Sequence, residues 1–192
     1  MKLIRQTDYK RMPWKNGLGF TDQIAIGPQD AKFPNDPFDW RLSTATVSDP
    51  GPFSVFQHCD RWLTVVEGNG LTLNDLPLRY GECARLSGEA PVHGKPIDGS
   101  VKDLGLIFAR RACNAEMKFV EANTGSLIVD CDADKSCFLY LCRGELAIGS
   151  TSMVAGETLA LEANVATKLL CVEKAEFVLI KISSLLDKVA TT

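Results

Sequence analysis

The sequence predicts an all-β protein made of two similar units, on the evidence of its short apolar segments, the turn residues between them and an internal repeat. The apolar segments are rich in β-branched and aromatic residues, as strands are, and include Trp62–Val66, Leu104–Phe108, Phe138–Leu141 and Phe177–Ile180. Turn residues such as Gly68-Asn69-Gly70 bound nearly all of them. Only Ile182 to Ala190 approaches a period of about 3.6 residues, so we expect a short C-terminal helix there and strands elsewhere.

An internal repeat relates two stretches of the chain. VVEGNGLTLNDLPLRYGECARL begins at Val65, and YLCRGELAIGSTSMVAGETLAL begins at Tyr140. Most matches share an offset of 75 residues, namely Leu71 with Leu146, Leu73 with Ile148, Leu78 with Met153, Gly81 with Gly156, Glu82 with Glu157 and Leu86 with Leu161. Gly68 and Gly144 match at an offset of 76, so one residue is inserted in the first copy just after the glycine. Because β-hairpins resemble one another, chance similarity is the alternative to duplication.

The repeated pattern favours a particular kind of β-structure. Each copy runs as strand, Gly turn, strand, tight turn, hydrophobic residue, Gly-Glu and strand. A lone hairpin leaves its edges unpaired, whereas a double-stranded antiparallel barrel pairs them. The pattern is similar to that of small-molecule-binding cupin barrels. We therefore expect a bicupin of two double-stranded β-helix (jelly-roll) barrels, with an N-terminal segment and the first barrel in residues 1–111 and the second barrel in residues 112–192.

Composition and charge exclude several classes of protein. With 45% hydrophobic and 23% charged residues, the chain has the composition of a globular protein. Its net charge of −3 and lack of a basic stripe argue against nucleic acid as a partner. No apolar run approaches the roughly 20 residues that cross a bilayer, and no signal-peptide core follows Met1. The seven cysteines form no C-x-x-C pair, so we expect buried free thiols and a cytoplasmic location.

Polar and aromatic residues that a bare scaffold does not require occur first near the N-terminus. Trp14, Lys15 and Asn16 precede Gly17-Leu18-Gly19, whose glycines permit a tight turn. These three residues would offer a ligand an aromatic wall, a cation and an amide. A surface loop anchored by the tryptophan is the structural alternative.

Two further stretches could contribute to the same pocket. In Phe38–Val47, alternation places Arg41 on one face beside the small residues Ser43 and Ala45, which leaves room for a ligand next to a guanidinium. The planar guanidinium is a natural bidentate partner for a carboxylate, although a structural salt bridge is the alternative. Ser54, Phe56 and Arg61 lead into the first repeat and could join the cavity, while Glu67 and Asp103 could pair with an arginine. The candidate ligand-binding residues are therefore Trp14, Lys15, Asn16, Arg41, Ser43, Ser54, Phe56 and Arg61.

Metal and nucleophilic chemistry find little support in the sequence. His58 and His93 are the only histidines, so a three-histidine cupin metal centre is excluded by count, and we expect no metal and no cofactor. A weaker site formed by His58 with carboxylates remains open. No G-x-S-x-G nucleophile elbow occurs, whereas acid–base chemistry by a carboxylate or Lys15 stays possible.

Three motifs together resemble the HutD/Ves family. They are W-K-N-G-L-G-x-T from Trp14, F-D-W-R-L-S-x-A from Phe38, and G-P-F-S-x-F followed by D-R-x-L-T-x-x-E-G from Gly51 to Gly68. The resemblance implies a bicupin fold without the usual metal ligands and, in many members, an association with histidine utilisation; other members are described as stress-induced. It carries over the pocket residues Trp14, Asn16, Arg41, Phe56 and Arg61. It implies no established catalytic activity.

The chain departs from this family pattern at three places. The usual Gly-Gly after W-K-N is Gly17-Leu18, and the frequent F-P-G is Phe56-Gln57-His58. The stretch D-L-G-L-I-F-A-R from Asp103 is similar to the family's D-x-N-x-M-x-R segment, but Gly105 stands in place of its Asn. Loss of that Asn removes one amide from the expected pocket, and His58 adds an imidazole near its mouth. The ligand could therefore differ from that of members tied to histidine metabolism.

Three functions fit these observations. The first is a small-molecule binding or sensing protein whose ligand is a small carboxylate, such as a formylated or formimidoyl amino acid or urocanate. The second is a metal-independent isomerase or hydrolase acting on a small carboxylate, which requires a group of shifted pKa in the cavity. The third is a structural homodimer with a vestigial pocket. The cavity residues of the second barrel are apolar, so we expect a filled core there.

Overall fold

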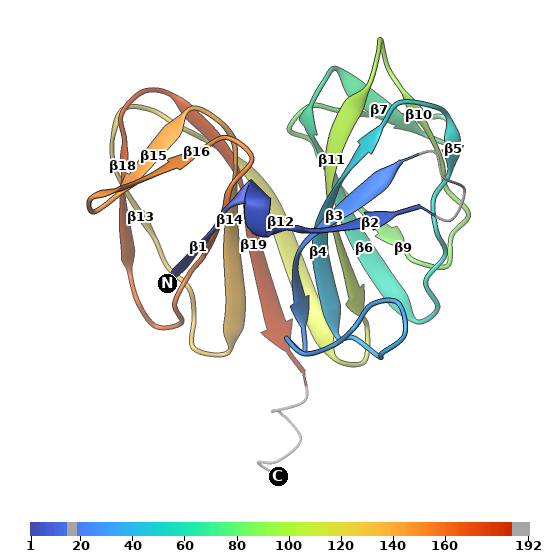
Figure 1. Ribbon diagram of the computed structural model, residues 1–192, viewed down its shortest axis with the longest axis horizontal. Coiled ribbons are helices and arrows are strands. Elements are labelled where there is room, and N and C mark those ends of the chain that lie inside the picture. Colours follow the sequence, from blue (N-terminus) through green and yellow to red (C-terminus); the bar gives the residue numbers. More distant parts are fainter. Residues whose placement is uncertain (15–18, 186–192) are drawn as a thin grey trace. The chain divides into compact units, whose positions relative to one another are not determined.

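The computed structural model describes residues 1–14 and 19–185 and confirms the all-β class. The chain forms two compact units (Figure 1). The first unit is Tyr9–Cys113, and the second unit combines Met1–Asp8 with Asn114–Thr192. In the described residues, the only helix is the 3-10 turn η1 (Gln6–Asp8), and no helix has the length and hydropathy to cross a membrane.

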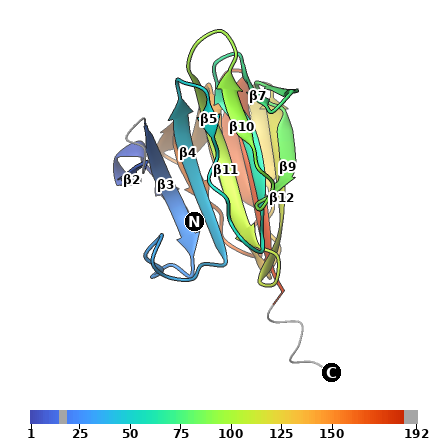
Figure 2. The ribbon, with the colours of Figure 1, turned by 90° about the vertical axis from the view of Figure 1, so that its right-hand side faces the viewer.

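Two antiparallel sheets form the first unit. The six-stranded sheet has the order β2 (Lys10–Pro13), β3 (Phe20–Gly27), β4 (Trp40–Val47), β11 (Val101–Ala109), β6 (Cys59–Glu67) and β9 (Cys83–Ser87). The four-stranded sheet has the order β5 (Gly51–Pro52), β10 (His93–Pro96), β7 (Gly70–Leu73) and β8 (Leu76–Arg79). Figure 2 shows β3, β4 and β11 side by side in the larger sheet. Side chains from both sheets meet in one apolar cluster, so the sheets face each other across Val47, Leu63, Val65, Leu71, Leu73, Leu78, Val92 and Val101.

The second unit has the same two-sheet construction. Its five-stranded sheet has the order β1 (Lys2–Ile4), β17 (Thr158–Ala160), β14 (Lys135–Arg143), β19 (Ala175–Ser184) and β12 (Cys113–Ala122). Its four-stranded sheet has the order β13 (Gly125–Val129), β18 (Thr167–Cys171), β15 (Glu145–Ile148) and β16 (Thr151–Val154). Leu139, Leu141, Leu146, Ile148 and Leu159 are buried in its core, with Leu161 packed against them, which confirms the prediction of a filled interior.

Strand order supports duplication of one unit. The order β4-β11-β6-β9 in the first unit corresponds to β12-β19-β14-β17 in the second, and β5-β10-β7-β8 corresponds to β13-β18-β15-β16. The first unit extends its larger sheet with β3 and β2 beyond β4, whereas the second adds β1 beyond β17. The shared pattern of the two repeats therefore reflects a shared topology.

The glycines of the repeat have matching backbone roles. Gly81 has φ +78° and its amide donates to the Val65 carbonyl at 3.0 Å. Gly156 has φ +88° and its amide donates to the Leu141 carbonyl at 2.7 Å. An L side chain disfavours this left-handed region, so glycine is required for the turn that leads into the next strand.

Two sequence predictions need correction. Ile182 to Ser184 continue β19, so the predicted C-terminal helix is wrong for these residues, because pairing with β14 outweighs a weak helical pattern; residues 186–192 lie outside the described part. The prediction of free thiols is wrong for Cys131 and Cys137, which form a disulfide across the turn that joins β13 to β14, with Cα atoms 5.8 Å apart.

Candidate ligand-binding site

The inner face of the six-stranded sheet carries the two arginines singled out from the sequence. Val47, Val65 and Val101 from β4, β6 and β11 lie in the core between the sheets, and alternation along each strand places every second residue on that same face. Arg41 and Arg61 both pair with Ile107 of β11, one from each side. The two guanidinium side chains therefore start from a single row across the sheet.

Arg41 is buried, with 5% of its surface exposed, and burial lowers its pKa to about 10. Its Nε donates a hydrogen bond to Gln23 Oε1 at 2.9 Å, and its guanidinium carbon lies 4.1 Å from the centre of the Phe33 ring. Among the described residues, no carboxylate lies within 4.0 Å of it. The charge of Arg41 is thus met by an amide oxygen and an aromatic face.

Arg61 is equally buried at 5% exposure, and burial lowers its pKa, while the charge of Asp103 acts in the opposite direction. Its Nη2 donates to the Ser54 carbonyl, and its guanidinium carbon lies 5.8 Å and 5.7 Å from the rings of Phe53 and Phe56. Its Nε has no hydrogen-bond partner in the part of the chain that the structure describes. A buried donor left without a partner costs about 1–3 kcal/mol, so Arg61 retains capacity to bind an acceptor.

Three phenylalanines form a cluster against the arginines. The ring centres of Phe33 and Phe38 are 5.7 Å apart, those of Phe33 and Phe56 are 6.1 Å apart, and those of Phe38 and Phe56 are 6.3 Å apart. Because Phe33 also stacks on Arg41 and Phe56 lies near Arg61, the cluster gives the cationic site an apolar wall.

The next row inward has small side chains. Gly105 pairs with Ser43 on one side and Leu63 on the other. A Cβ placed on Gly105 would make an ordinary contact at 3.7 Å, with Leu63 Cδ1, so an alanine here would not clash. Ser43 is buried, so two small residues, Ser43 and Gly105, lie beside Leu63 between the arginine row and Asp103.

The third row contains a buried acid. Asp103 pairs with Ala45 of β4 and Val65 of β6 and is 6% exposed. Burial raises the pKa of Asp103 to about 7, although the positive charge of Arg61 and a hydrogen bond from the Ala45 backbone oppose the rise. This carboxyl group therefore exchanges its proton near neutral pH.

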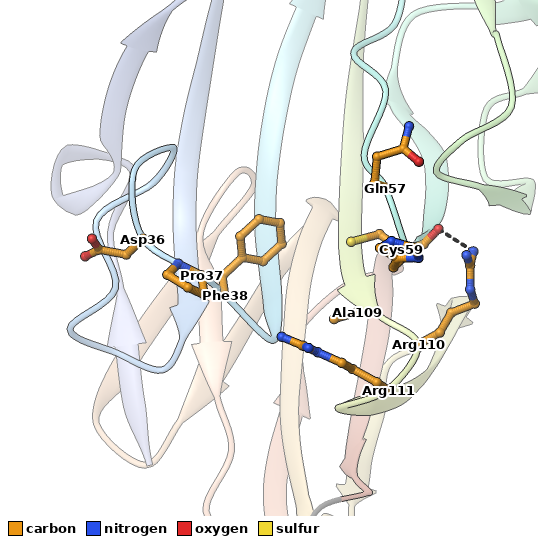
Figure 3. A pocket seen from close by; sticks show the side chains of 9 residues that line it. Asp36, Pro37, Phe38, Gln57, Cys59, Ala109, Arg110 and Arg111 are labelled. Carbon is orange, nitrogen blue, oxygen red and sulfur yellow. Dashed lines mark hydrogen bonds between the residues drawn. The ribbon is translucent and has the colours of Figure 1, made fainter.

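A hollow of about 650 Å³ opens at one end of the same unit. Figure 3 shows Asp36, Pro37 and Phe38 on one side of it, across from Gln57, Cys59 and Arg110. Phe38 also belongs to the phenylalanine cluster that flanks the arginines. The hollow and the arginine row thus share one wall.

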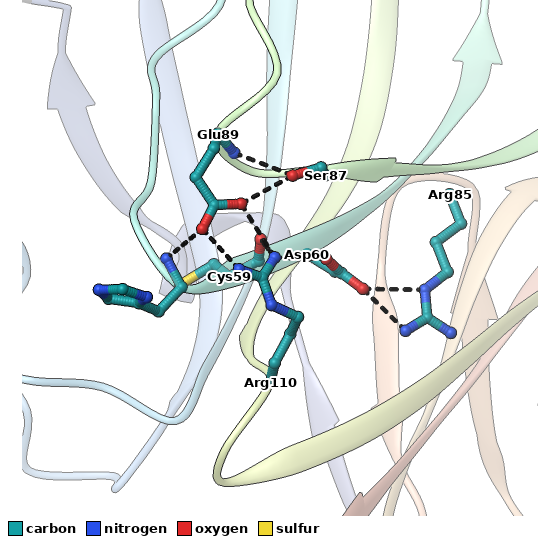
Figure 4. Close-up of polar contacts among 7 residues, drawn as sticks. Cys59, Asp60, Arg85, Ser87, Glu89 and Arg110 are labelled. Atoms are coloured by element: carbon teal, nitrogen blue, oxygen red, sulfur yellow. Dashed lines mark hydrogen bonds and ion pairs between the residues drawn. The ribbon is translucent and has the colours of Figure 1, made fainter.

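The rim of this hollow is fixed by Glu89. Its carboxylate accepts hydrogen bonds from the Arg110 guanidinium at 2.9 and 2.5 Å and from the His58 backbone amide at 2.6 Å (Figure 4). Asp60 links Arg110 to Arg85, with contacts of 2.9 and 2.8 Å. His58 has φ +59°, an unusual conformation for a residue other than glycine, and the Glu89 contact holds its backbone there.

Comparison with known proteins identifies the family. The HutD family model matches residues 6–179, which is most of the chain. The chain belongs to the HutD family. A 21.2 kDa protein in the hutC 3' region of Pseudomonas putida is 36% identical over 129 residues, covering 65% of this chain and 66% of that protein. Protein Ves of Cronobacter sakazakii is 31% identical over 123 residues, covering 59% of this chain and 65% of Ves. The matches thus span just under two thirds of each relative's length.

Solved HutD-like structures cover nearly the whole fold. The conserved protein of unknown function PA5104 from Pseudomonas aeruginosa PAO1 has a TM-score of 0.80 at 30% identity, covering 95% of this chain and 98% of that one. HutD from Pseudomonas fluorescens SBW25, in a formate condition, has a TM-score of 0.75 at 25% identity with the same coverage. A cupin 2 conserved barrel domain protein from Leptotrichia buccalis, at 11% identity and a TM-score of 0.52, covers 88% of this chain and 91% of its own and shows the cupin fold alone.

The structure brings together most of the described residues that the HutD/Ves resemblance and the sequence pattern suggested. Arg41, Ser43, Phe56 and Arg61 belong to the inner site, while Ser54 contributes its backbone carbonyl. Trp14 packs against the apolar cluster of the first unit, and its Nε1 donates to Thr21 Oγ1 at 2.9 Å. Lys15 and Asn16 lie outside the described residues. The ligand-binding role of all eight stays a prediction.

Other expectations fall elsewhere in the HutD fold. Glu67 pairs with Lys102 at 3.1 Å and not with an arginine of the site. His58 lines the open hollow, whereas His93 begins β10. In residues 1–14 and 19–185, no three His, Cys, Asp or Glu side chains are grouped closely enough to hold a metal ion.

Sequence reasoning missed three residues of the site. Gln23 lies opposite Ser43 in β3 and could have been found from strand alternation if β3 had been predicted. Phe33 lies in the loop between β3 and β4, where no periodic pattern indicates its direction. Phe53 belongs to the G-P-F-S-x-F motif, but nothing in the sequence predicts that its ring lies beside Arg61.

Proposed function

We propose that this protein binds a small carboxylate inside its first unit and acts as a binding or sensing protein linked to histidine utilisation. The observation that carries the proposal is the pair of buried arginines on either side of Ile107. Among the described residues, Arg61 Nε has no hydrogen-bond partner and Arg41 has no carboxylate within 4.0 Å.

Charge and shape both favour a small carboxylate. A guanidinium offers paired N–H donors whose spacing matches the two oxygens of a carboxylate. Two such cations removed from water are costly unless an anion or other partners compensate them. The phenylalanine cluster supplies an apolar wall, and Gly105 and Ser43 add little bulk beside it, so the site suits an anion with a modest organic body.

The link to histidine utilisation rests on the family. The Pseudomonas putida relative is described by its place in the hutC 3' region, and the solved Pseudomonas fluorescens relative is a HutD. That relative was solved in a formate condition, and formate is the smallest carboxylate. Urocanate and formylated or formimidoyl amino acids are the corresponding candidate ligands.

Calorimetry with purified protein tests this proposal. Formate, urocanate and N-formylglutamate are titrated into the wild type and into the variants Arg41→Ala and Arg61→Ala. We expect at least one to bind, and each variant to weaken its binding by about 10–100-fold, the worth of a charge-assisted hydrogen bond. Arg79→Ala removes an exposed arginine of β8 and serves as the matched control, for which no change is expected. Failure of every carboxylate to bind wild type would overturn the proposal.

A metal-independent isomerase or hydrolase is the second candidate, and Asp103 is the observation that favours it. A carboxyl group with a pKa of about 7 is suited to general acid or base catalysis at neutral pH. Incubation of each ligand with chelated protein, followed by NMR of the solution, distinguishes the two functions. Turnover that is lost in Asp103→Asn supports the enzyme, and unchanged ligand supports the binding protein.

A further inference from the structure

The inner face of the first unit carries charged residues in two rows, with the row of Ser43, Gly105 and Leu63 between them. Arg41 and Arg61 lie level with Ile107 of β11, Gly105 follows, and Asp103 comes next on the same face. Ile107 and Asp103 are four residues apart, or about 13 Å along the strand. The distance between the guanidinium groups and the Asp103 carboxyl group is shorter than this span if their side chains extend toward each other.

Within residues 1–14 and 19–185, Asp103 has no ion-pair partner. The Ala45 backbone amide donates to it and the charge of Arg61 acts on it, but no N–O distance within 4.0 Å joins it to Arg61 or any other described cation. The apolar Val65 lies beside it in β6, and Val47 and Val101 form the next row. A buried carboxyl group with one backbone donor retains capacity for a donor supplied by a ligand.

We propose that Asp103 is the second anchor of the ligand, which is therefore a small zwitterion or a carboxylate with an N–H-bearing group at its far end. This inference rests on the proposed carboxylate binding. The ligand's carboxylate meets Arg41 and Arg61, its body lies along the small residues Gly105 and Ser43, and its ammonium, amidine or imidazole N–H donates to Asp103.

Protonation of Asp103 makes this selectivity dependent on pH. Among the described residues, the groups that act on the pKa of Asp103 are Arg61 from β6 and the Ala45 amide from β4. Arg41, which lies two rows away, is the charged side chain on the inner face of β4. Because the pKa of Asp103 is about 7, a cationic end favours the ionised form and releases a proton on binding near pH 7. An aliphatic carboxylate has no such effect.

Matched pairs of ligands isolate the second anchor. The probes are 3-aminopropanoate with butanoate, 4-aminobutyrate with pentanoate, and 5-aminopentanoate with hexanoate, each pair equal in size but different at the far end. We expect wild type at pH 8 to prefer at least one amino acid over its partner by 10-fold or more, with the preference shrinking as the pH falls to 6. Titrations in two buffers of different ionisation enthalpy should show proton release only for the amino acids.

The variant Asp103→Asn should lose the preference for the amino acids over the alkanoates. The pH series in wild type gives the same information without a substitution, in case the variant does not fold. If alkanoates and amino acids bind equally well at every pH, the second anchor is wrong while carboxylate binding stands. If none of the six probes binds and urocanate, formate and N-formylglutamate also fail, the proposed function itself is wrong.

Discussion

Glu82 and Glu157 cap the same turn in the two units. Glu82 Oε2 accepts a hydrogen bond from the Arg79 amide at 2.8 Å, and Glu157 Oε2 accepts one from the Val154 amide at 3.0 Å. Their surroundings differ, because Glu82 is exposed whereas Glu157 is 5% exposed and also accepts from Arg5 Nη1 at 2.7 and 2.9 Å. One sequence signal thus carries unequal energetic weight in the two copies.

We expect Glu157→Ala to lower the free energy of unfolding by about 2–4 kcal/mol, because it leaves a cation and a backbone amide without their buried acceptor. Glu82→Ala should cost about 0.5–1 kcal/mol, the value of an exposed cap. Chemical denaturation of both variants measures the difference. Equal losses would mean that burial and the Arg5 contact add nothing.

Glu89 should contribute to stability in a defined pH range. Hydrogen bonds from Arg110 and Ser87, with a further one from the His58 amide, hold the pKa of Glu89 well below its usual range. The folded state therefore binds its proton less readily than the unfolded state, and the stabilisation is present above about pH 4.5 and lost as the pH falls below it. Melting temperatures of wild type and Glu89→Gln should differ most above pH 5 and converge in acid. Ser87→Ala keeps the carboxylate, so its offset from wild type should change less with pH.

Asp103 should have the opposite effect. Burial raises its pKa from 3.8 to about 7, so the folded state binds the proton more tightly than the unfolded state does. Its contribution then becomes unfavourable as the pH rises from about 4 to 7. Asp103→Asn should match wild type near pH 4 and exceed its unfolding free energy at pH 8, by on the order of 4 kcal/mol. Asp75→Asn, in an exposed turn, should show no such trend, and a pH-independent offset for Asp103→Asn would contradict the expectation.

Two substitutions at Gly105 should affect stability and ligand binding differently. Because an added Cβ has only an ordinary contact at 3.7 Å, Gly105→Ala should stabilise the protein by about 0.4–1 kcal/mol through the unfolded chain. Gly105→Leu should place an isobutyl group between Arg61 and Asp103. Calorimetry with the best carboxylate found for wild type should show near-normal binding for the first variant and a loss of 10-fold or more for the second. Unchanged binding in Gly105→Leu would place the ligand elsewhere.

The strand framework could be predicted because local signals agree with the tertiary structure. The apolar runs and the Gly-Glu repeat mark the strands from β6 to β9 and from β14 to β17, which have equivalent places in the two sheet pairs. Arg41 and Ser43 could be placed on one face because alternation in an eight-residue strand leaves little freedom.

The remaining features depend on contacts between segments distant in the sequence. The burial of Arg61 against Phe53 and the stacking of Phe33 on Arg41 follow from how loops return to the sheet, which no local pattern encodes. The sequence indicates Asp103 only as a salt-bridge partner, because its burial, which raises its pKa, depends on how the unit packs. The Cys131–Cys137 disulfide likewise depends on a turn that brings two strand ends together.

Pairing of β1 with β17 places Lys2 opposite Ala160. Synthesis proceeds at about 5–20 residues per second, so Lys2 exists for roughly 8–30 seconds before its partner is made. During that interval the whole first unit, Tyr9–Cys113, has already been made. On the ribosome, β1 therefore stays without its sheet partner while the whole first unit is made, and it can join the larger sheet of the second unit only after β17 has been translated.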